Sequence, residues 1–97
     1  MERTILIGII TQEQGYERSM DYLKELAFLT LTAGGDVIKT FTQRLSNPNP
    51  RTFIGEGKIT EIKEYILKNH IKTVIFDDEL SATQERNISK IFNCKIL

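Results

Sequence analysis

Two hydrophobic periodicities alternate along the chain, one typical of strands and one typical of helices. Residues 4–10 form a nearly continuous apolar run that only Gly8 interrupts, which predicts a strand covered by helices on both faces. Shorter runs with β-branched residues at 36–42, 73–76 and 95–97 predict three more strands. No internal repeat or low-complexity stretch breaks this alternation.

Helical spacing fills the first interval between the predicted strands. Apolar residues recur at intervals of three and four between residues 17 and 33, which predicts an amphipathic helix. Its apolar stripe consists of Met20, Leu23, Ala27 and Leu31, widened by Leu26 and Leu29. The pattern stops at Gly34-Gly35, where glycine permits the left-handed conformation that ends helices.

Two further helices are predicted in the second half of the chain. One begins at Lys58 and ends near Asn69-His70, with His70 expected to cap it rather than to act as a base. Its apolar face consists of Ile59, Ile62 and Ile66. Ser81 and Gln84 match a capping box, which predicts that the other helix begins directly after Ser81. The buried face of this last helix consists of Ile88, Ile91 and Phe92.

Strands separated by helices of this length predict parallel pairing with right-handed crossovers. The expected fold is therefore α/β, a three-layer sandwich in which a four-stranded, mostly parallel sheet is flanked by three helices. The strand order across the sheet is expected to be second, first, third, fourth. Residues 1–97 form a single domain on this interpretation, since the length suits one modest core.

The segment 43–57 interrupts the regular pattern. It contains both prolines, in the successive steps Asn47-Pro48 and Asn49-Pro50, together with two of the six glycines. Such a segment can form neither a helix nor a central strand, and we expect a long, mobile loop.

Charge is balanced over the chain but not within this region. There are 13 basic and 13 acidic residues, so no global field attracts nucleic acid or a membrane. Residues 39–58 nevertheless hold four basic residues against one acid, an excess of three positive charges. Phosphate contacts are the expected use of such a local excess.

The remaining composition excludes several classes of protein. No run of 18 apolar residues and no signal-peptide pattern is present, which favours a cytoplasmic protein without a membrane span. Cys94 is the only cysteine, so it can form no internal disulfide, and it has no clustered histidine. We expect a structural role for Cys94, and no metal site.

Two long motifs carry more information than their secondary structure requires. The first is Thr42-Gln43-Arg44 followed by Arg51-Thr52-Phe53-Ile54-Gly55-Glu56-Gly57-Lys58. The second is Val74-Ile75-Phe76-Asp77-Asp78-Glu79-Leu80-Ser81, continuing to Gln84, Arg86 and Asn87. Together they resemble the HflX family of GTP-binding proteins, and Leu23, Glu25, Leu26, Ala27 and Thr32-Ala33-Gly34 match the first helix of that family.

The resemblance implies that this chain is an N-terminal domain that precedes a helical segment and a GTPase domain. It implies a partner, the large ribosomal subunit and its RNA, and it implies GTP and Mg²⁺ as cofactors of the parent protein. For this fragment we expect no cofactor, no catalysis and no catalytic residue. Gly57-Lys58 is followed by Ile59 rather than by Ser or Thr, so it is not a phosphate-binding loop of the P-loop type.

Ligands of open parallel sheets bind at the carboxyl ends of the strands, where the matched motifs place several polar side chains. The candidate RNA- or partner-binding residues are Gln43, Arg44, Arg51, Gly55, Gly57, Lys58, Asp77, Asp78, Glu79 and Arg86. A structural interpretation stays open beside this one. The acidic turn could instead pair with Arg44 or Lys58 merely to tie two loops together, and the two glycines could serve tight turns.

An alternative function is a small phosphoryl- or nucleotide-binding α/β module that uses Asp77 and Asp78, with carboxylates holding Mg²⁺. The sequence disfavours it. Receiver-like domains carry an acidic pair after the first strand, where this chain has Thr11-Gln12-Glu13. Nucleotide-binding sheets carry a glycine-rich turn there, which is also absent.

Overall fold

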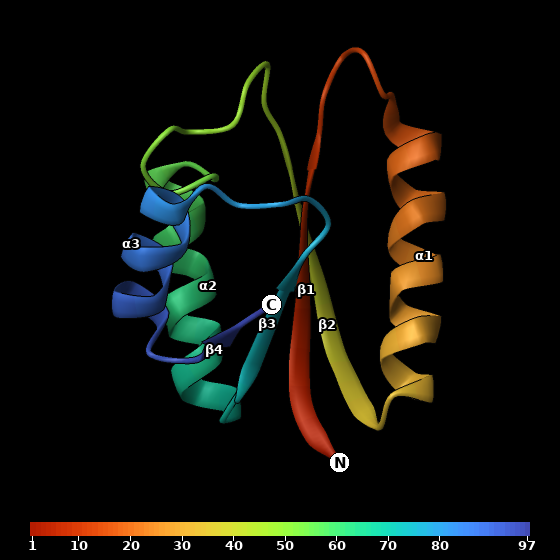
Figure 1. Ribbon diagram of the computed structural model, residues 1–97, viewed down its shortest axis with the longest axis vertical. Coiled ribbons are helices and arrows are strands. Elements are labelled where there is room, and N and C mark those ends of the chain that lie inside the picture. Colours follow the sequence, from red (N-terminus) through yellow and green to blue (C-terminus); the bar gives the residue numbers. More distant parts are fainter.

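The computed structural model describes all residues from 1 to 97 and confirms the predicted α/β sandwich (Figure 1). In chain order the elements are β1 (Glu2–Ile10), α1 (Tyr16–Thr32), β2 (Gly35–Arg44), α2 (Glu56–Asn69), β3 (Thr73–Phe76), α3 (Ala82–Phe92) and β4 (Lys95–Ile96). The four strands form one sheet in the order β2-β1-β3-β4, and every pair is parallel. The predicted strand order is therefore confirmed.

The main hydrophobic core lies between the sheet and the α2–α3 layer. Alternate residues of β1 and β3 point into it, because side chains alternate between the faces of a strand. Its members from the sheet include Ile5, Ile7, Ile9, Val74 and Phe76. The helices contribute Ile59, Ile62, Ile66, Ile88 and Phe92, so the predicted apolar faces of both helices are buried, except that Ile91 is only partly covered.

The opposite face of the sheet has a thinner cover, because α1 lies there alone (Figure 1). Leu23 of α1 is buried against this face, as are the β1 residues Leu6 and Ile10. The predicted apolar stripe on α1 is wrong at two positions, since Leu31 of the stripe is 56% exposed and Leu29, which was expected to widen it, is 55% exposed. No neighbouring helix is present to cover the flanks of α1.

The helix ends follow the predicted chemistry. The Ser81 hydroxyl accepts a hydrogen bond from the Gln84 N–H, and the Gln84 side chain accepts one from the Ser81 N–H, which completes the capping box. Gly34 has φ 94°, a left-handed conformation directly after α1. His70 is the left-handed C-cap of α2. None of the three helices combines the length and apolar composition needed to cross a membrane.

The long loop is shorter than the sequence predicts. β2 continues to Arg44 and α2 begins at Glu56, so the loop spans residues 45–55. Gln43 and Arg44, expected in the loop, instead pair with Ile9 and Ile10 of β1. Parallel pairing with a fully buried strand extends β2 beyond the point where its own hydrophobic pattern ends.

Replacing Ile62 with Ala should lower the free energy of unfolding by about 2–5 kcal/mol, because the side chain is 0% exposed and its removal leaves a cavity. Urea denaturation of the 97-residue chain measures this change. Leu67→Ala in the same helix is the control, since Leu67 is 68% exposed and should change stability by about 0.5 kcal/mol or less. Equal losses for both variants would show that α2 does not bury the Ile62 face.

Candidate functional site

Three loops meet at the carboxyl edge of the sheet, at the top of Figure 1. They are residues 11–15 after β1, residues 45–55 after β2 and residues 77–81 after β3. β2 pairs with β1 on one side, and β3 pairs with β1 on the other side. The direction in which strands are added therefore reverses between β1 and β3, which makes this position the topological switch point of the sheet. Open α/β sheets bind their ligands at such a point.

Asp77 lies at the centre of this edge, immediately after β3. Its backbone N–H donates to the Ile7 carbonyl at 2.9 Å, so the residue is held against β1. A side chain at Gly8 would clash, because a Cβ atom there would lie 2.6 Å from Asp77 Oδ2 and 3.0 Å from Leu23 Cδ1. Gly8 therefore makes room for the carboxylate, which explains the interruption of the apolar run.

The Asp77 carboxylate is poorly compensated in this position. Its Oδ1 atom is buried without a hydrogen-bond partner. The pKa of Asp77 is raised from 3.8 to about 6, mainly by burial and also by the charge of Asp78, while the backbone N–H groups of Ile9 and Asp77 act in the opposite direction. The Asp77 carboxyl group thus lies near the surface and has a pKa at which it can exchange a proton near neutral pH.

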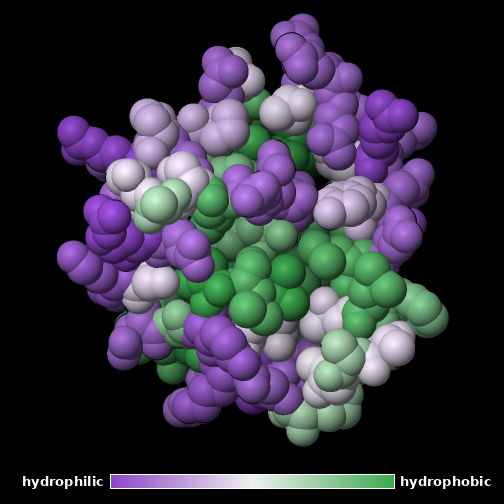
Figure 2. All heavy atoms as spheres, viewed as in Figure 1, coloured by the Kyte–Doolittle hydropathy of each residue, from purple (hydrophilic) through white to green (hydrophobic).

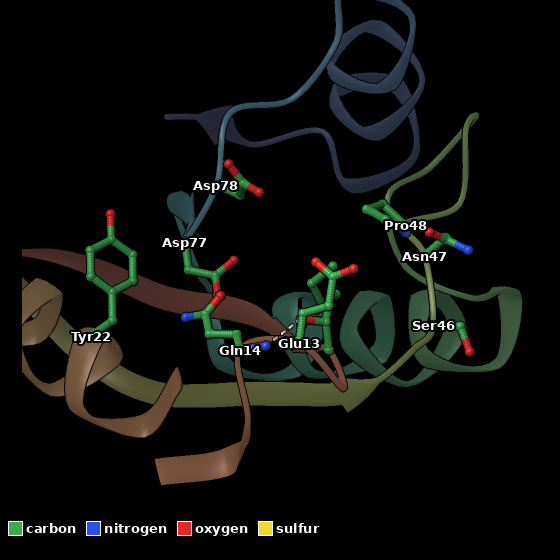
Figure 3. Close-up of a pocket in the computed structure, with 10 residues that line it drawn as sticks. Glu13, Gln14, Tyr22, Ser46, Asn47, Pro48, Asp77 and Asp78 are labelled. Atoms are coloured by element: carbon green, nitrogen blue, oxygen red, sulfur yellow. Dashed lines mark hydrogen bonds between the residues drawn. The ribbon is translucent and has the colours of Figure 1, made fainter. Parts of the chain in front are cut away.

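A cavity of about 480 Å³ opens beside Asp77, between the first and second of the three loops and Tyr22 of α1 (Figure 3). Its lining consists of Ile9, Thr11, Glu13, Gln14, Tyr22, Ser46, Asn47, Pro48, Asp77 and Asp78. Three carboxylates and no basic residue belong to this set. The cavity therefore disfavours phosphate groups, which counts against the alternative of a phosphoryl- or nucleotide-binding site at Asp77 and Asp78. No group of three or more His, Cys, Asp or Glu residues is arranged to hold a metal ion.

The loop 45–55, for which we expected mobility from its prolines, makes several hydrogen bonds within itself and to α3. The Asn49 side chain accepts hydrogen bonds from the N–H groups of Arg51 at 2.8 Å and Thr52 at 3.2 Å, which closes a turn over the second Asn-Pro step. Asn49 and Phe53 also exchange two backbone hydrogen bonds. The sequence could not reveal these contacts, because they depend on a side chain folding back onto its own loop.

Side chains of α3 hold the same loop from outside. Gln84 Nε2 donates to the Asn49 carbonyl at 2.8 Å, and Asn87 Nδ2 donates to the Arg51 carbonyl at 3.0 Å. Phe53 and Ile54 are buried in the core, and the Phe53 ring meets the Phe76 ring edge-on at 5.4 Å. Phe53 adopts φ 67°, which is unfavourable for a residue with a side chain, so its burial outweighs this backbone strain.

Residues of the second motif, Gln84 and Asn87 of α3, therefore hold in place the loop 45–55, which carries part of the first motif. Gln43 has a comparable role, because its Oε1 accepts a hydrogen bond from the Gly55 N–H at 2.9 Å, at the N-cap of α2. The two glycines here need no unusual conformation. Gly55 has φ −72° and Gly57 lies within the first turn of α2 with open space around it, so the tight-turn interpretation is wrong for both.

The basic candidates do not neutralise the acidic turn. The two ion pairs of the structure are Lys58–Glu61 at 3.4 Å and Lys95–Glu2 at 3.5 Å. The prediction that the basic loop holds the Asp77-Asp78-Glu79 turn through ion pairs is wrong. The turn is stabilised locally instead, since Asp78 Oδ1 accepts a hydrogen bond from the Glu79 N–H at 2.8 Å.

Arg44 and Arg51 remain as exposed cations without an acidic partner. The Arg44 guanidinium lies over the Tyr16 ring, 5.5 Å from its centroid. Lys39, part of the same charge excess, lies apart from the loop over the rings of Phe41 and Tyr65. Arg86 is exposed on α3, next to the Asn87 that holds Arg51.

A second hollow of about 390 Å³ lies beside Arg44. Its lining is Ile10, Thr11, Gln12, Gly15, Arg44, Leu45 and Ser46, with no carboxylate among them. The carboxyl edge thus holds an acidic cavity at Asp77 and an adjoining basic, hydroxyl- and amide-lined hollow at Arg44, and the two share Thr11 and Ser46. The sequence predicted Arg44 at this edge but could not distinguish the two environments.

Comparison with known proteins identifies relatives over nearly the whole chain. The family described as "GTP-binding GTPase N-terminal" matches residues 20–97. The "GTPase HflX" of Flavobacterium psychrophilum is 57% identical over 99% of this chain, which corresponds to 23% of that protein. The proteins of the same name from Caldanaerobacter subterraneus and Escherichia coli are 38% and 31% identical, again over 99% of this chain and 22% of each relative. The chain therefore spans less than a quarter of the length of these relatives.

The buried carboxylate allows a test by pH. Because the folded-state pKa of Asp77 exceeds its ordinary value, folding favours the protonated form, and the unfolding free energy should fall as pH rises from about 4 to about 6. The Asp77→Asn variant has no carboxylate to ionise in the folded state. The Tm of the variant minus the Tm of the unmodified chain should therefore increase from about pH 4 to about pH 6 and stay positive at higher pH. Thermal melts between about pH 4 and pH 8 measure the difference.

Glu79→Gln is the control, because it removes one exposed negative charge from the same turn. It should show no comparable pH-dependent gain. A lower Tm for Asp77→Asn at every pH would indicate that the ionised Asp77 is held by a partner, contrary to its unpaired Oδ1.

Proposed function

This chain belongs to the HflX family as the N-terminal domain of a GTPase, and we propose that it serves the full-length protein as a ribosome-contact domain without chemistry of its own. Its role would be to bind RNA of the large ribosomal subunit in the cytoplasm, while GTP and Mg²⁺ are bound elsewhere in the polypeptide. The resemblance of the two motifs to that family suggests the partner. The geometry of the carboxyl edge suggests which residues would meet it.

The hollow at Arg44 is the observation that carries the proposal. A phosphate group requires a cation, hydrogen-bond donors and the absence of nearby carboxylates. Arg44 supplies the cation, Thr11, Gln12 and Ser46 supply hydroxyl and amide donors, and no carboxylate lines the hollow. The contact between Arg44 and Tyr16 restricts the guanidinium before a ligand arrives, which reduces the entropy lost on binding.

Arg51 extends the same contact surface along the anchored loop. Its carbonyl is fixed by Asn87 and its N–H by Asn49, while its side chain is exposed. Lys58 in the first turn of α2 and Arg86 on α3 are secondary candidates, and Lys58 is already paired to Glu61. The other candidate residues, including Gln43 and the acidic turn, would position the loops rather than contact RNA.

The 97-residue chain should neither bind nor hydrolyse GTP. No segment forms a phosphate-binding loop, since Lys58 lies in the first turn of α2 and is followed by the buried Ile59, while Phe53 and Ile54 before it fill the core. Calorimetry with GTP and Mg²⁺ should give no binding heat. The full-length protein is the positive control in the same titration, and a micromolar Kd for the 97-residue chain would contradict this prediction.

Replacing Arg44 and Arg51 together with Gln in the full-length protein should weaken its binding to the large ribosomal subunit. Each lost phosphate contact should reduce the slope of log K against log salt concentration by about one unit. Sedimentation binding assays at several salt concentrations measure this slope. The fold should survive, because neither side chain is buried or ion-paired.

The matched control is Lys63→Gln with Lys68→Gln, which removes the same charge from exposed positions on α2. It should leave the slope unchanged. An unchanged affinity and slope in the folded Arg44 and Arg51 variant would assign RNA contact to another part of the full-length protein.

A further inference from the structure

The first turn of α1 carries an exposed aromatic ring at the carboxyl edge of the sheet. Tyr16 is the first residue of the helix, and 51% of its surface is exposed. Figure 2 shows that this edge, at the top of the view, is mostly hydrophilic, whereas the hydrophobic surface lies near the middle of the view. An exposed ring at a hydrophilic edge suits a ligand that is polar but has one flat, apolar face.

The Tyr16 ring has one charged partner and no aromatic one. The Arg44 guanidinium lies over the ring, 5.5 Å from its centroid. The aromatic pairs of the structure are Phe41 with Tyr65 and Phe53 with Phe76, so no other ring stacks on Tyr16. A guanidinium over a ring covers one of its two faces. Tyr16 therefore retains a face on which another flat group can stack.

Arg44 connects this ring to the hollow of about 390 Å³. Gly15, the N-cap residue directly before Tyr16, lines the hollow together with Arg44. No side chain caps α1 at Gly15, so the first N–H groups and the positive dipole end of the helix lie beside the hollow. Glu17 of the same turn is exposed and is not part of the lining. A negatively charged group in the hollow would therefore be attracted by Arg44 and by the start of α1.

The acidic cavity at Asp77 restricts how a charged ligand can lie across this edge. The cavity adjoins the hollow, since Thr11 and Ser46 line both. Three carboxylates line the cavity, and they would repel any further phosphate group of a ligand held at Arg44. Such a ligand would therefore avoid the cavity and continue along the side of the hollow on which Tyr16 lies.

A phosphate beside a flat group is the chemistry of a nucleotide. In an RNA duplex each base is paired and stacked between its neighbours, so its face cannot reach a protein ring. An unpaired base can turn outward, and such bases stack on tyrosine rings and arginine guanidinium groups. The pair of Tyr16 and Arg44, next to a hollow without carboxylates, therefore matches an unpaired nucleotide better than a duplex.

We propose that the RNA bound at this edge presents an unpaired nucleotide, whose phosphate lies in the hollow at Arg44 and whose base stacks on the Tyr16 ring. This inference rests on the proposed function and adds to it the class of RNA that is bound. Stacking requires no hydrogen bond to a base edge, so the contact tolerates any base. Arg44 supplies the salt-dependent part of the affinity, and Tyr16 supplies a part that depends on the presence of a base.

A short single-stranded RNA and the same strand without bases separate stacking from phosphate contact. Fluorescence anisotropy with the full-length protein gives the Kd of both strands. Tyr16→Leu should weaken binding of the RNA at least about fivefold more than binding of the abasic strand, because the abasic strand has nothing to stack. A duplex of the same sequence should respond to Tyr16→Leu no more than the abasic strand does.

Two variants are controls for the ring. Tyr16→Phe keeps the aromatic face and should keep the ratio of the two Kd values. Tyr22→Leu removes a ring of similar exposure, 46%, from the same helix, but Tyr22 lines the acidic cavity instead of contacting Arg44. It should leave the ratio unchanged.

The variant with Gln at positions 44 and 51 tests the proposed function in the same assay, because it should weaken both strands and reduce the salt slope. If it does so while Tyr16→Leu leaves the ratio of the Kd values unchanged, phosphate contact stands and base stacking is wrong. An equal loss with the duplex would show that the nucleotide need not be unpaired, which also overturns the inference. If the Gln variant affects neither strand, the proposed function and the inference are both wrong.

Discussion

The direction in which the chain crosses its own sheet determines most features of this molecule. From β1 the chain moves to β2 on one side, and from β2 it crosses back to β3 on the other. Since parallel crossovers are right-handed, this reversal places α1 on one face and the next two helices on the opposite one. The loops after β1 and β3 consequently separate at the carboxyl edge, where the cavity at Asp77 opens, and α1 is left without a neighbour.

This reversal also explains why sequence patterns predicted the second half of the chain better than the first helix. Ile59, Ile62 and Ile66 occupy a face that meets both the sheet and α3, so hydrophobic spacing and burial coincide. Leu29 has the same spacing in α1 but remains over half exposed. Periodicity shows which residues share a side of a helix, and only the arrangement of the neighbouring elements decides whether that side is covered.

Sequence reasoning named candidate residues and the edge of the sheet on which they lie, but not the interactions that these residues make. The resemblance of the motifs indicated Arg44, Arg51 and the acidic turn, and the rule for parallel sheets placed their loops at one edge. The resemblance could not show that the amide groups of Gln84 and Asn87 donate hydrogen bonds to the loop 45–55, because hydrogen bonds to distant carbonyls leave no periodic signal. The resemblance also could not show that Asp77 lacks a cationic partner, because ion pairing depends on distances between side chains that a motif does not give.

The absence of a side chain at Gly8 affects the acidity of Asp77, in the loop that follows β3. A Cβ atom at that position would displace the Asp77 carboxylate toward water, and Leu23 leaves little room for another arrangement. Hydration would then replace the burial that weakens the acid. Positions 8 and 77 are thus sterically coupled: a larger residue in the first strand would displace the acid, and a smaller residue in place of the acid would remove the need for glycine.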